Sequence, residues 1–188
     1  METVKTGIDI SNVLVFLIEK VLILACDMEK SINKIFEPLL YQIIHLIAKK
    51  GSLNSSHKEI LSIIDILIEN SSAHQNLKIR EISSQCTAEY IKWFIKQHSD
   101  HTIKEKNATI KYLIRTVESY AQHPDSFKRL GAVMCFDKIV VEMSQSDVLI
   151  DKFVIEIASY CFAVLKISYN SKELQDIIFN YVASVKYD

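Results

Sequence analysis

The sequence predicts an all-α protein, built as a HEAT-like helical-repeat solenoid of about eight helices in antiparallel pairs. Turn-forming residues are scarce, since only three glycines and two prolines occur in 188 residues that are 49% hydrophobic. A fold of many short strands would need more turns than that. Apolar residues also recur at steps of three and four through long stretches, which is typical of one buried helix face. Both observations favour long helices.

A third observation is the stretch 123–140, HPDSFKRLGAVMCFDKIV, which contains a turn followed by a helix start. Pro124 restricts the residue before it and Asp125 favours turns, so the preceding helix is expected to end there. Asp125 is then expected to cap the next helix by accepting hydrogen bonds from its free amides. That helix repeats apolar residues at steps of three, four or their sums, namely Phe127, Leu130, Val133, Met134, Val140 and Met143.

The same helix start recurs along the chain. Each copy has a cap-forming residue four positions before a long polar one: Asn76 and Arg80, Asp125 and Arg129, Ser171 and Gln175. Positions 76 and 125 are 49 apart, and positions 125 and 171 are 46 apart. A period near 45 that contains two helices is typical of HEAT-type repeats. We expect each arginine to bond backbone or acidic groups in the turn of the adjacent repeat and to set the stacking angle.

The first half of the chain predicts four helices. The first, at about 8–30, is apolar nearly all round, and the second follows at about 32–49. Pro38 predicts a kink or a late start in the second helix, because proline lacks an amide donor. Turn-forming residues at 51–56 precede a third helix at about 57–69, with an isoleucine-rich stripe. After another polar turn, the fourth helix runs to about residue 98.

The second half predicts four more helices. The fifth begins near 102 or 107 and ends at 122, and the sixth is the stretch described above, to about 143. A seventh spans about 148–169, and the eighth begins at Ser171 and runs to the end. Paired in order, the helices give repeat-like units at about 8–50, 57–99, 102–143 and 147–187, within a single segment, 1–188.

The first helix suggests that this array continues. Val13, Phe16 and Leu17 lie among apolar residues on nearly every side of it, whereas the end of a helical array should present a polar face. We therefore expect the chain to be a segment of a much larger protein, whose apolar ends neighbouring repeats cover. A dimer that forms through those ends is the alternative.

Charge and cysteine usage exclude several classes. The formal net charge of −1 gives no overall attraction to nucleic acid or to an anionic membrane. Cys26, Cys86, Cys135 and Cys161 form no Cys-x-x-Cys pair, so reduced, buried thiols are favoured over a disulfide or zinc framework. No membrane span is expected, because the clean apolar runs are far shorter than the roughly 20 residues that a bilayer needs.

No catalytic, cofactor-binding or metal-binding residue is predicted, and no cofactor. Glycine occurs only at positions 7, 51 and 131, which excludes the glycine-rich loops of kinase and Walker-type phosphate sites. His98 and His101 are three apart, a spacing that two metal ligands on a helix can have. We interpret them as a solvated helix junction, with a metal pair as the alternative.

One cluster of basic residues is a candidate patch for contacts with phosphate groups. Its members are Lys104, Lys106, Lys111 and Lys128, together with Arg115 and Arg129. Each phosphate contact would add salt dependence to DNA binding. The alternative is an ordinary solvated face, because Glu105 and Glu118 are interleaved with the lysines.

Four stretches resemble one known family. They are FEPLLYQIIHLIAKK (36–50), REISSQCTAEYIKWFIKQ (80–97), HPDSFKRLGAVMCFDKIV (123–140) and DVLIDKFVIEIASYCFAVL (147–165). In order and wording they are similar to the helical cradle of the DNA-dependent protein kinase catalytic subunits, which belong to the phosphatidylinositol 3-kinase-related kinases. The resemblance covers most of Ile32 to Leu165.

The resemblance implies a function that the residues alone do not. Members of this family are very large nuclear Ser/Thr kinases, which the Ku heterodimer recruits to DNA ends during non-homologous end joining. Their helical repeats form a cradle, so this chain is expected to be a scaffold segment of a kinase and not itself an enzyme. A stand-alone helical-repeat adaptor that binds a partner protein is the alternative. The Ser/Thr-Gln preference of these kinases makes Ser144, which precedes Gln145, a candidate phosphorylation site.

Overall fold

The computed structural model describes residues 10–50, 57–97, 103–144 and 147–167. Within these ranges the chain forms seven α-helices and no strand, which confirms the predicted all-α helical-repeat fold. The helices are α1 (Ile10–Ala25), α2 (Lys30–Lys50), α3 (His57–Ala73), α4 (Leu77–Gln97), α5 (Ile103–Ala121), α6 (Ser126–Met143) and α7 (Asp147–Ile167). The predicted eighth helix lies outside the described residues.

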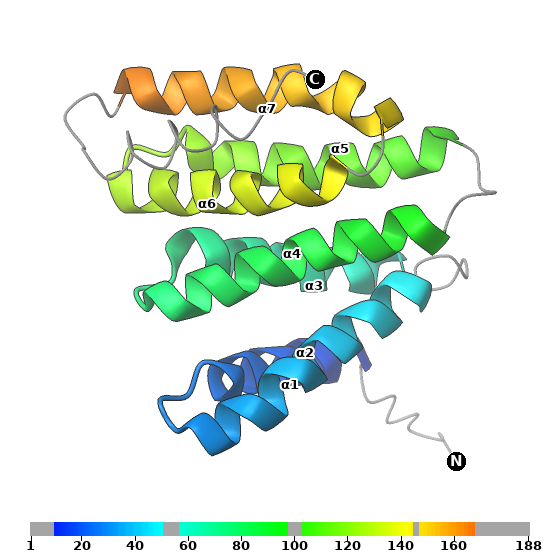
Figure 1. Ribbon diagram of the computed structural model, residues 1–188, viewed down its shortest axis with the longest axis vertical. Coiled ribbons are helices and arrows are strands. Elements are labelled where there is room, and N and C mark those ends of the chain that lie inside the picture. Colours follow the sequence, from blue (N-terminus) through cyan, green and yellow to red (C-terminus); the bar gives the residue numbers. More distant parts are fainter. Residues whose placement is uncertain (1–9, 51–56, 98–102, 145–146, 168–188) are drawn as a thin grey trace, which may run out of the picture.

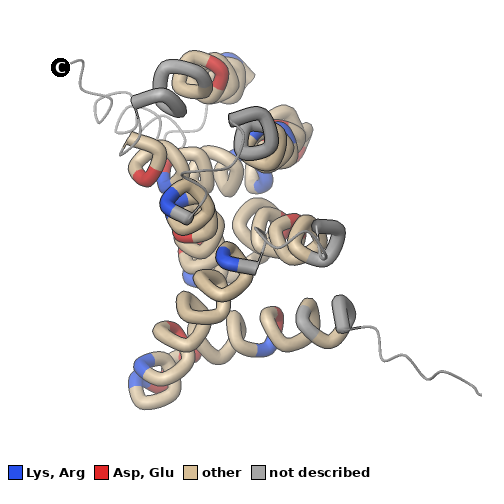
Figure 2. The backbone as a smooth tube through the Cα atoms, turned by 90° about the vertical axis from the view of Figure 1, so that its right-hand side faces the viewer, with Lys and Arg blue, Asp and Glu red and all other residues tan. Residues whose placement is uncertain are grey.

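Consecutive helices pair into hairpins that stack in two layers (Figure 1). α1 packs on α2, α3 on α4 and α5 on α6. Between hairpins, α2, α4 and α6 contact one another in sequence in one layer, and α1, α3, α5 and α7 do so in the other. Figure 1 also shows α2 inclined to α4, whereas α4 and α6 run nearly side by side. Figure 2 shows the same stack turned by 90°.

Two helix boundaries differ from the prediction in the first hairpin. α1 ends at Ala25, about five residues early, because the chain turns at Asp27, whose carboxylate accepts the amide of Glu29 at 2.8 Å. α2 begins at Lys30 and continues through Pro38. The predicted late start was therefore wrong. Pro38 falls in the third turn of the helix.

α3 runs to Ala73 and so extends past its predicted end at about residue 69. The polar residues that suggested a turn stay helical because their side chains bond carbonyls of the preceding turn. Asn70 Nδ2 donates to Ile66 O at 3.0 Å, and Ser71 Oγ donates to Ile68 O at 2.8 Å. The hairpin turn begins only at His74, where helix-forming contacts end.

α6 is enclosed by neighbouring helices on most sides. Half of its 18 residues are buried: Arg129, Gly131, Ala132, Val133, Cys135, Phe136, Ile139, Val140 and Met143. It packs against α3, α4, α5 and α7, so side chains around most of its circumference are shielded from solvent. None of the described helices has the length and hydropathy of a membrane span.

Candidate functional site

The described polar contacts with the longest reach join one hairpin to the next, and Arg80 makes the most buried of them. Its side chain is 1% exposed. Its Nε donates to Ser71 O at 3.2 Å, near the end of α3, and its Nη2 donates to Phe127 O at 2.8 Å, in the first turn of α6. The guanidinium also lies over the Phe127 ring, with Cζ 4.0 Å from the ring centroid. One side chain thus links three helices.

The charge of Arg80 is held in a largely dry place. Burial lowers the pKa of Arg80, and the nearby Asp125 carboxylate acts in the opposite direction. Asp125 is also the N-cap of α6, where its Oδ1 accepts the amide of Phe127 at 2.9 Å. An arginine is the suitable cation here, because its planar head stacks on an aromatic ring while donating several hydrogen bonds.

Gly131 makes the close approach at this joint possible. A Cβ at position 131 would lie 2.5 Å from both Ser71 O and Ser72 Cα, and 2.7 Å from Arg80 Nη2. Any side chain would therefore force α6 away from the end of α3. Sequence reasoning missed this role. The available signal was a glycine inside a strong helical pattern, which costs about 1 kcal/mol relative to alanine and so needs a packing reason.

Arg129 occupies the equivalent repeat position and likewise bonds backbone carbonyls of its own hairpin. Its Nη1 donates to His123 O at 2.9 Å and to Pro124 O at 2.6 Å, both in the turn of its own hairpin. In the first hairpin, Asn33 Nδ2 donates to Ala25 O, the last residue of α1. A polar side chain one turn into the even helix therefore closes the hairpin in each case, and Arg80 also reaches the following hairpin.

The turns before α4 and α6 share a further pattern that sequence reasoning missed. His74 Nδ1 accepts the amide of Asn76 at 3.0 Å, and His123 Nδ1 accepts the amide of Asp125 at 3.0 Å. Asn76 in turn accepts the amide of Lys78 at 2.9 Å, as Asp125 does for Phe127. The visible signal is a histidine two residues before each cap, 49 residues apart.

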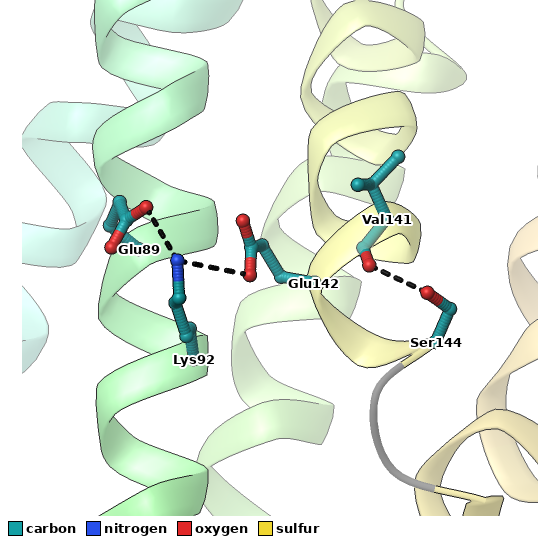
Figure 3. Close-up of polar contacts among 5 residues, drawn as sticks. All are labelled: Glu89, Lys92, Val141, Glu142 and Ser144. Carbon is teal, nitrogen blue, oxygen red and sulfur yellow. Dashed lines mark hydrogen bonds and ion pairs between the residues drawn. The ribbon is translucent and has the colours of Figure 1, made fainter.

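An ion cluster joins the far ends of α4 and α6 (Figure 3). Lys92 Nζ lies 3.0 Å from Glu89 Oε1, on the same helix, and 3.5 Å from Glu142 Oε2 on α6. The Glu142 side chain is only 10% exposed. The hydrogen bond to Glu89 raises the pKa of Lys92, which burial opposes. Sequence reasoning found no role for Glu142, because its partners lie about 50 residues away.

A third cross-hairpin contact lies in the other layer of helices. Tyr112 Oη, on α5, donates toward both carboxylate oxygens of Asp65, on α3, at 2.8 and 2.9 Å. The two residues are 47 apart, as are Arg80 and Phe127. The second and third hairpins are therefore joined in both layers.

The basic patch is described only in part. Lys111 is exposed on α5, and Lys128 is half-buried with its Nζ 3.5 Å from His123 Nε2. Lys104 and Lys106 belong to the first turn of α5, but their side chains lie outside the described residues. Contact with phosphate groups stays a prediction.

Four other residues were singled out by the sequence: Ser144, Ser171, His98 and His101. Ser144 is exposed at the end of α6, where its Oγ donates to Val141 O at 2.7 Å (Figure 3). Its phosphorylation stays a prediction. Ser171 and the pair His98 and His101 fall outside the described residues. Among the residues that are described, no cluster of three or more histidine, cysteine or acidic side chains could hold a metal ion.

The first hairpin has an uncovered apolar face. On α1, Val13, Phe16, Leu17 and Ile23 are 45–60% exposed, and on α2, Ile35, Leu39 and Leu46 are 38–65% exposed. These residues lie opposite the faces that α1 and α2 turn toward the rest of the stack, which contain Ile18, Leu22, Leu40 and Ile44. The side of the first hairpin that faces away from the rest of the stack is therefore apolar.

Hairpins of antiparallel helices that stack in two layers, the second and third joined by polar contacts, define a helical-repeat scaffold. The family described as "DNA-dependent protein kinase catalytic subunit, CC1/2" matches residues 12–174, and the chain belongs to this family. The resemblance seen in the sequence is thereby confirmed.

Two relatives show how far the similarity extends. The chain is 30% identical over 133 residues to the DNA-dependent protein kinase catalytic subunit of Gallus gallus, which covers 71% of the chain. It is also 30% identical over 145 residues, or 77% of the chain, to the protein of that name from Dictyostelium discoideum. In both cases the matched region is 3% of the relative's length.

Proposed function

We propose that this chain is a structural scaffold segment of a DNA-dependent protein kinase catalytic subunit, which acts in the nucleus in double-strand break repair by non-homologous end joining. Membership of the CC1/2 family supports this function. The size of the relatives supports it too, because the 133 matched residues are only 3% of a polypeptide of several thousand residues. The parent protein would be a Ser/Thr kinase, with the Ku heterodimer and DNA ends as its partners.

The uncovered apolar face of the first hairpin is the observation that carries a scaffold role within a longer array. Phe16 is 60% exposed and Ile35 is 65% exposed, although each lies in a stripe of similar residues. Burying such a side chain contributes about 1.5–3 kcal/mol. Neighbouring helical repeats of the same polypeptide are the partners that would cover this face, since each repeat stacks on the next through surfaces of this kind.

The size of the native protein tests the proposal directly. An immunoblot with an antibody to this chain should show a band of several hundred kilodaltons. A band near 21.6 kDa, the mass of the chain, would contradict the proposal and would favour a stand-alone adaptor that binds a partner protein.

A substitution on the uncovered face tests the scaffold role in cells. Leu46→Asp in the full-length protein should lower end-joining efficiency, because it would place a carboxylate in the contact with a neighbouring repeat. Val141→Asp is the matched control, since Val141 is 53% exposed on α6 and Leu46 is 58% exposed on α2. Equal effects of the two substitutions at equal protein levels would contradict the proposed contact.

A further inference from the structure

The contact between α4 and α6 is fixed at both ends. Near the start of α4, Arg80 reaches Phe127 O, and toward its end Lys92 reaches Glu142. The α4 residues of these two contacts, Arg80 and Lys92, are 12 positions apart, which corresponds to about 18 Å along a helix. A single tie would let one helix pivot or slide on the other, whereas two separated ties oppose both motions.

The middle of the same contact is packed closely by small side chains. Ala88 of α4 and Ala132 and Cys135 of α6 are fully buried, and Gly131 brings α6 against the end of α3. Close packing of this kind transmits a shift of one helix to the other.

The other layer of helices, which contains α3 and α5, is also joined by a polar contact. The hydroxyl of Tyr112 on α5 donates to Asp65 on α3. All four helices of the second and third hairpins are thus held, α4 to α6 in one layer and α3 to α5 in the other.

The joint between the first and second hairpins is built in another way. His45 of α2 stacks on Trp93 of α4 with ring centroids 3.9 Å apart and planes at 26°. Both rings are half-buried. α2 is also inclined to α4 (Figure 1), and its opposite side carries the uncovered apolar face.

We propose that the second and third hairpins, α3 to α6, form one conformational unit that moves as a single body, and that the first hairpin opens independently of it. Such a unit would pass displacement from one side of the array to the other instead of absorbing it. The proposal holds equally for a segment of a kinase and for a stand-alone adaptor, so it does not depend on the proposed function.

Hydrogen exchange of the 188-residue chain, followed by mass spectrometry of its peptides, tests this. Peptides from α4 and α6 should show the same protection factor, within about threefold, and those from α1 and α2 a lower one. Glu142→Gln and Tyr112→Phe should each accelerate exchange throughout α3 to α6, by about two- to fivefold. Neither should change exchange in α1 and α2.

Glu89→Gln is the matched control, because it removes a partner of Lys92 within α4 and leaves the partner on α6. It should accelerate hydrogen exchange in α3 to α6 less than Glu142→Gln does. Faster exchange confined to the helix that carries the substitution would overturn the proposal, as would an equal acceleration in α1 and α2. Tyr112→Phe removes one exposed hydroxyl and keeps the ring. If Glu142→Gln does not fold, wild-type protection factors of α4 and α6 that differ more than tenfold would overturn it.

Discussion

Arg80 and Gly131 are in close contact, and the space beside the Gly131 Cα admits a hydrogen atom but no side chain. A Cβ at position 131 would lie 2.7 Å from Arg80 Nη2 and closer still to the backbone of Ser71 and Ser72. The contact depends on both residues. Because Gly131 has no side chain, α6 comes near enough for Arg80 to donate to Phe127 O.

Gly131→Ala should destabilise the chain by about 1–3 kcal/mol, the usual range for overpacking. Alanine is the better helix former by about 1 kcal/mol, so propensity alone predicts the opposite sign. Urea denaturation followed by circular dichroism measures the difference. Asp137→Ala, on a half-exposed position of α6, is the control and should have little effect. A Gly131→Ala variant as stable as the wild type would show that the joint has room.

Arg80→Lys should lower the free energy of unfolding by about 1–3 kcal/mol, because lysine cannot make both carbonyl bonds and stack on Phe127. Arg129→Ala should cost a similar amount through the loss of its bonds to His123 O and Pro124 O. Arg115→Ala is the matched control, since Arg115 is exposed on α5 and should change stability by less than about 0.5 kcal/mol. Three equal unfolding curves would contradict the assigned contacts.

Removal of a helix cap should have a smaller effect. Asn76→Ala and Asp125→Ala should each cost about 1 kcal/mol, because an amide in the first turn of α4 or α6 loses its acceptor. Asn76→Asp keeps the acceptor and should be nearly neutral. Thermal melting of the three variants checks this, and a loss in Asn76→Asp as large as in Asn76→Ala would argue against capping.

Alkaline pH should destabilise the chain through its buried thiols. Burial raises the pKa of Cys135 and of Cys161 to about 12, from an ordinary value of 9.0. Above pH 9 the unfolded chain releases these protons while the folded chain keeps them, so the free energy of unfolding falls as pH rises. The expected slope is up to about 1.4 kcal/mol per pH unit for each thiol.

Urea titrations at pH 8, 9 and 10 measure that slope, and Cys161→Ser should make it shallower. The same burial should protect both thiols from alkylating reagents at pH 8 until urea unfolds the chain. Rapid labelling of the folded chain would contradict the burial of these sulfurs.

Sequence periodicity predicted the helices well, because one buried face per helix is written into the spacing of apolar residues. Turn chemistry located Asn76 and Asp125 in the same way, since capping is decided by a few adjacent residues. The end of α3 was misplaced because Asn70 and Ser71 bond back into their own helix, an outcome that their composition does not distinguish from a turn.

The joint residues were harder to predict. Lys92 and Glu142 are 50 positions apart, and their meeting depends on how far along one another α4 and α6 are stacked. Gly131 was visible only as an exception to helix propensity. Contacts of this kind follow from the register between hairpins, which local patterns do not specify.

The uncovered face of the first hairpin makes the behaviour of the isolated chain depend on its concentration. Apolar side chains such as Phe16 and Ile35 remain more than half exposed to water. Two copies that meet through these faces would each be stabilised by mass action, so the melting temperature should rise as the protein is concentrated. Dilution then becomes the condition under which the intrinsic stability of the hairpin stack can be measured.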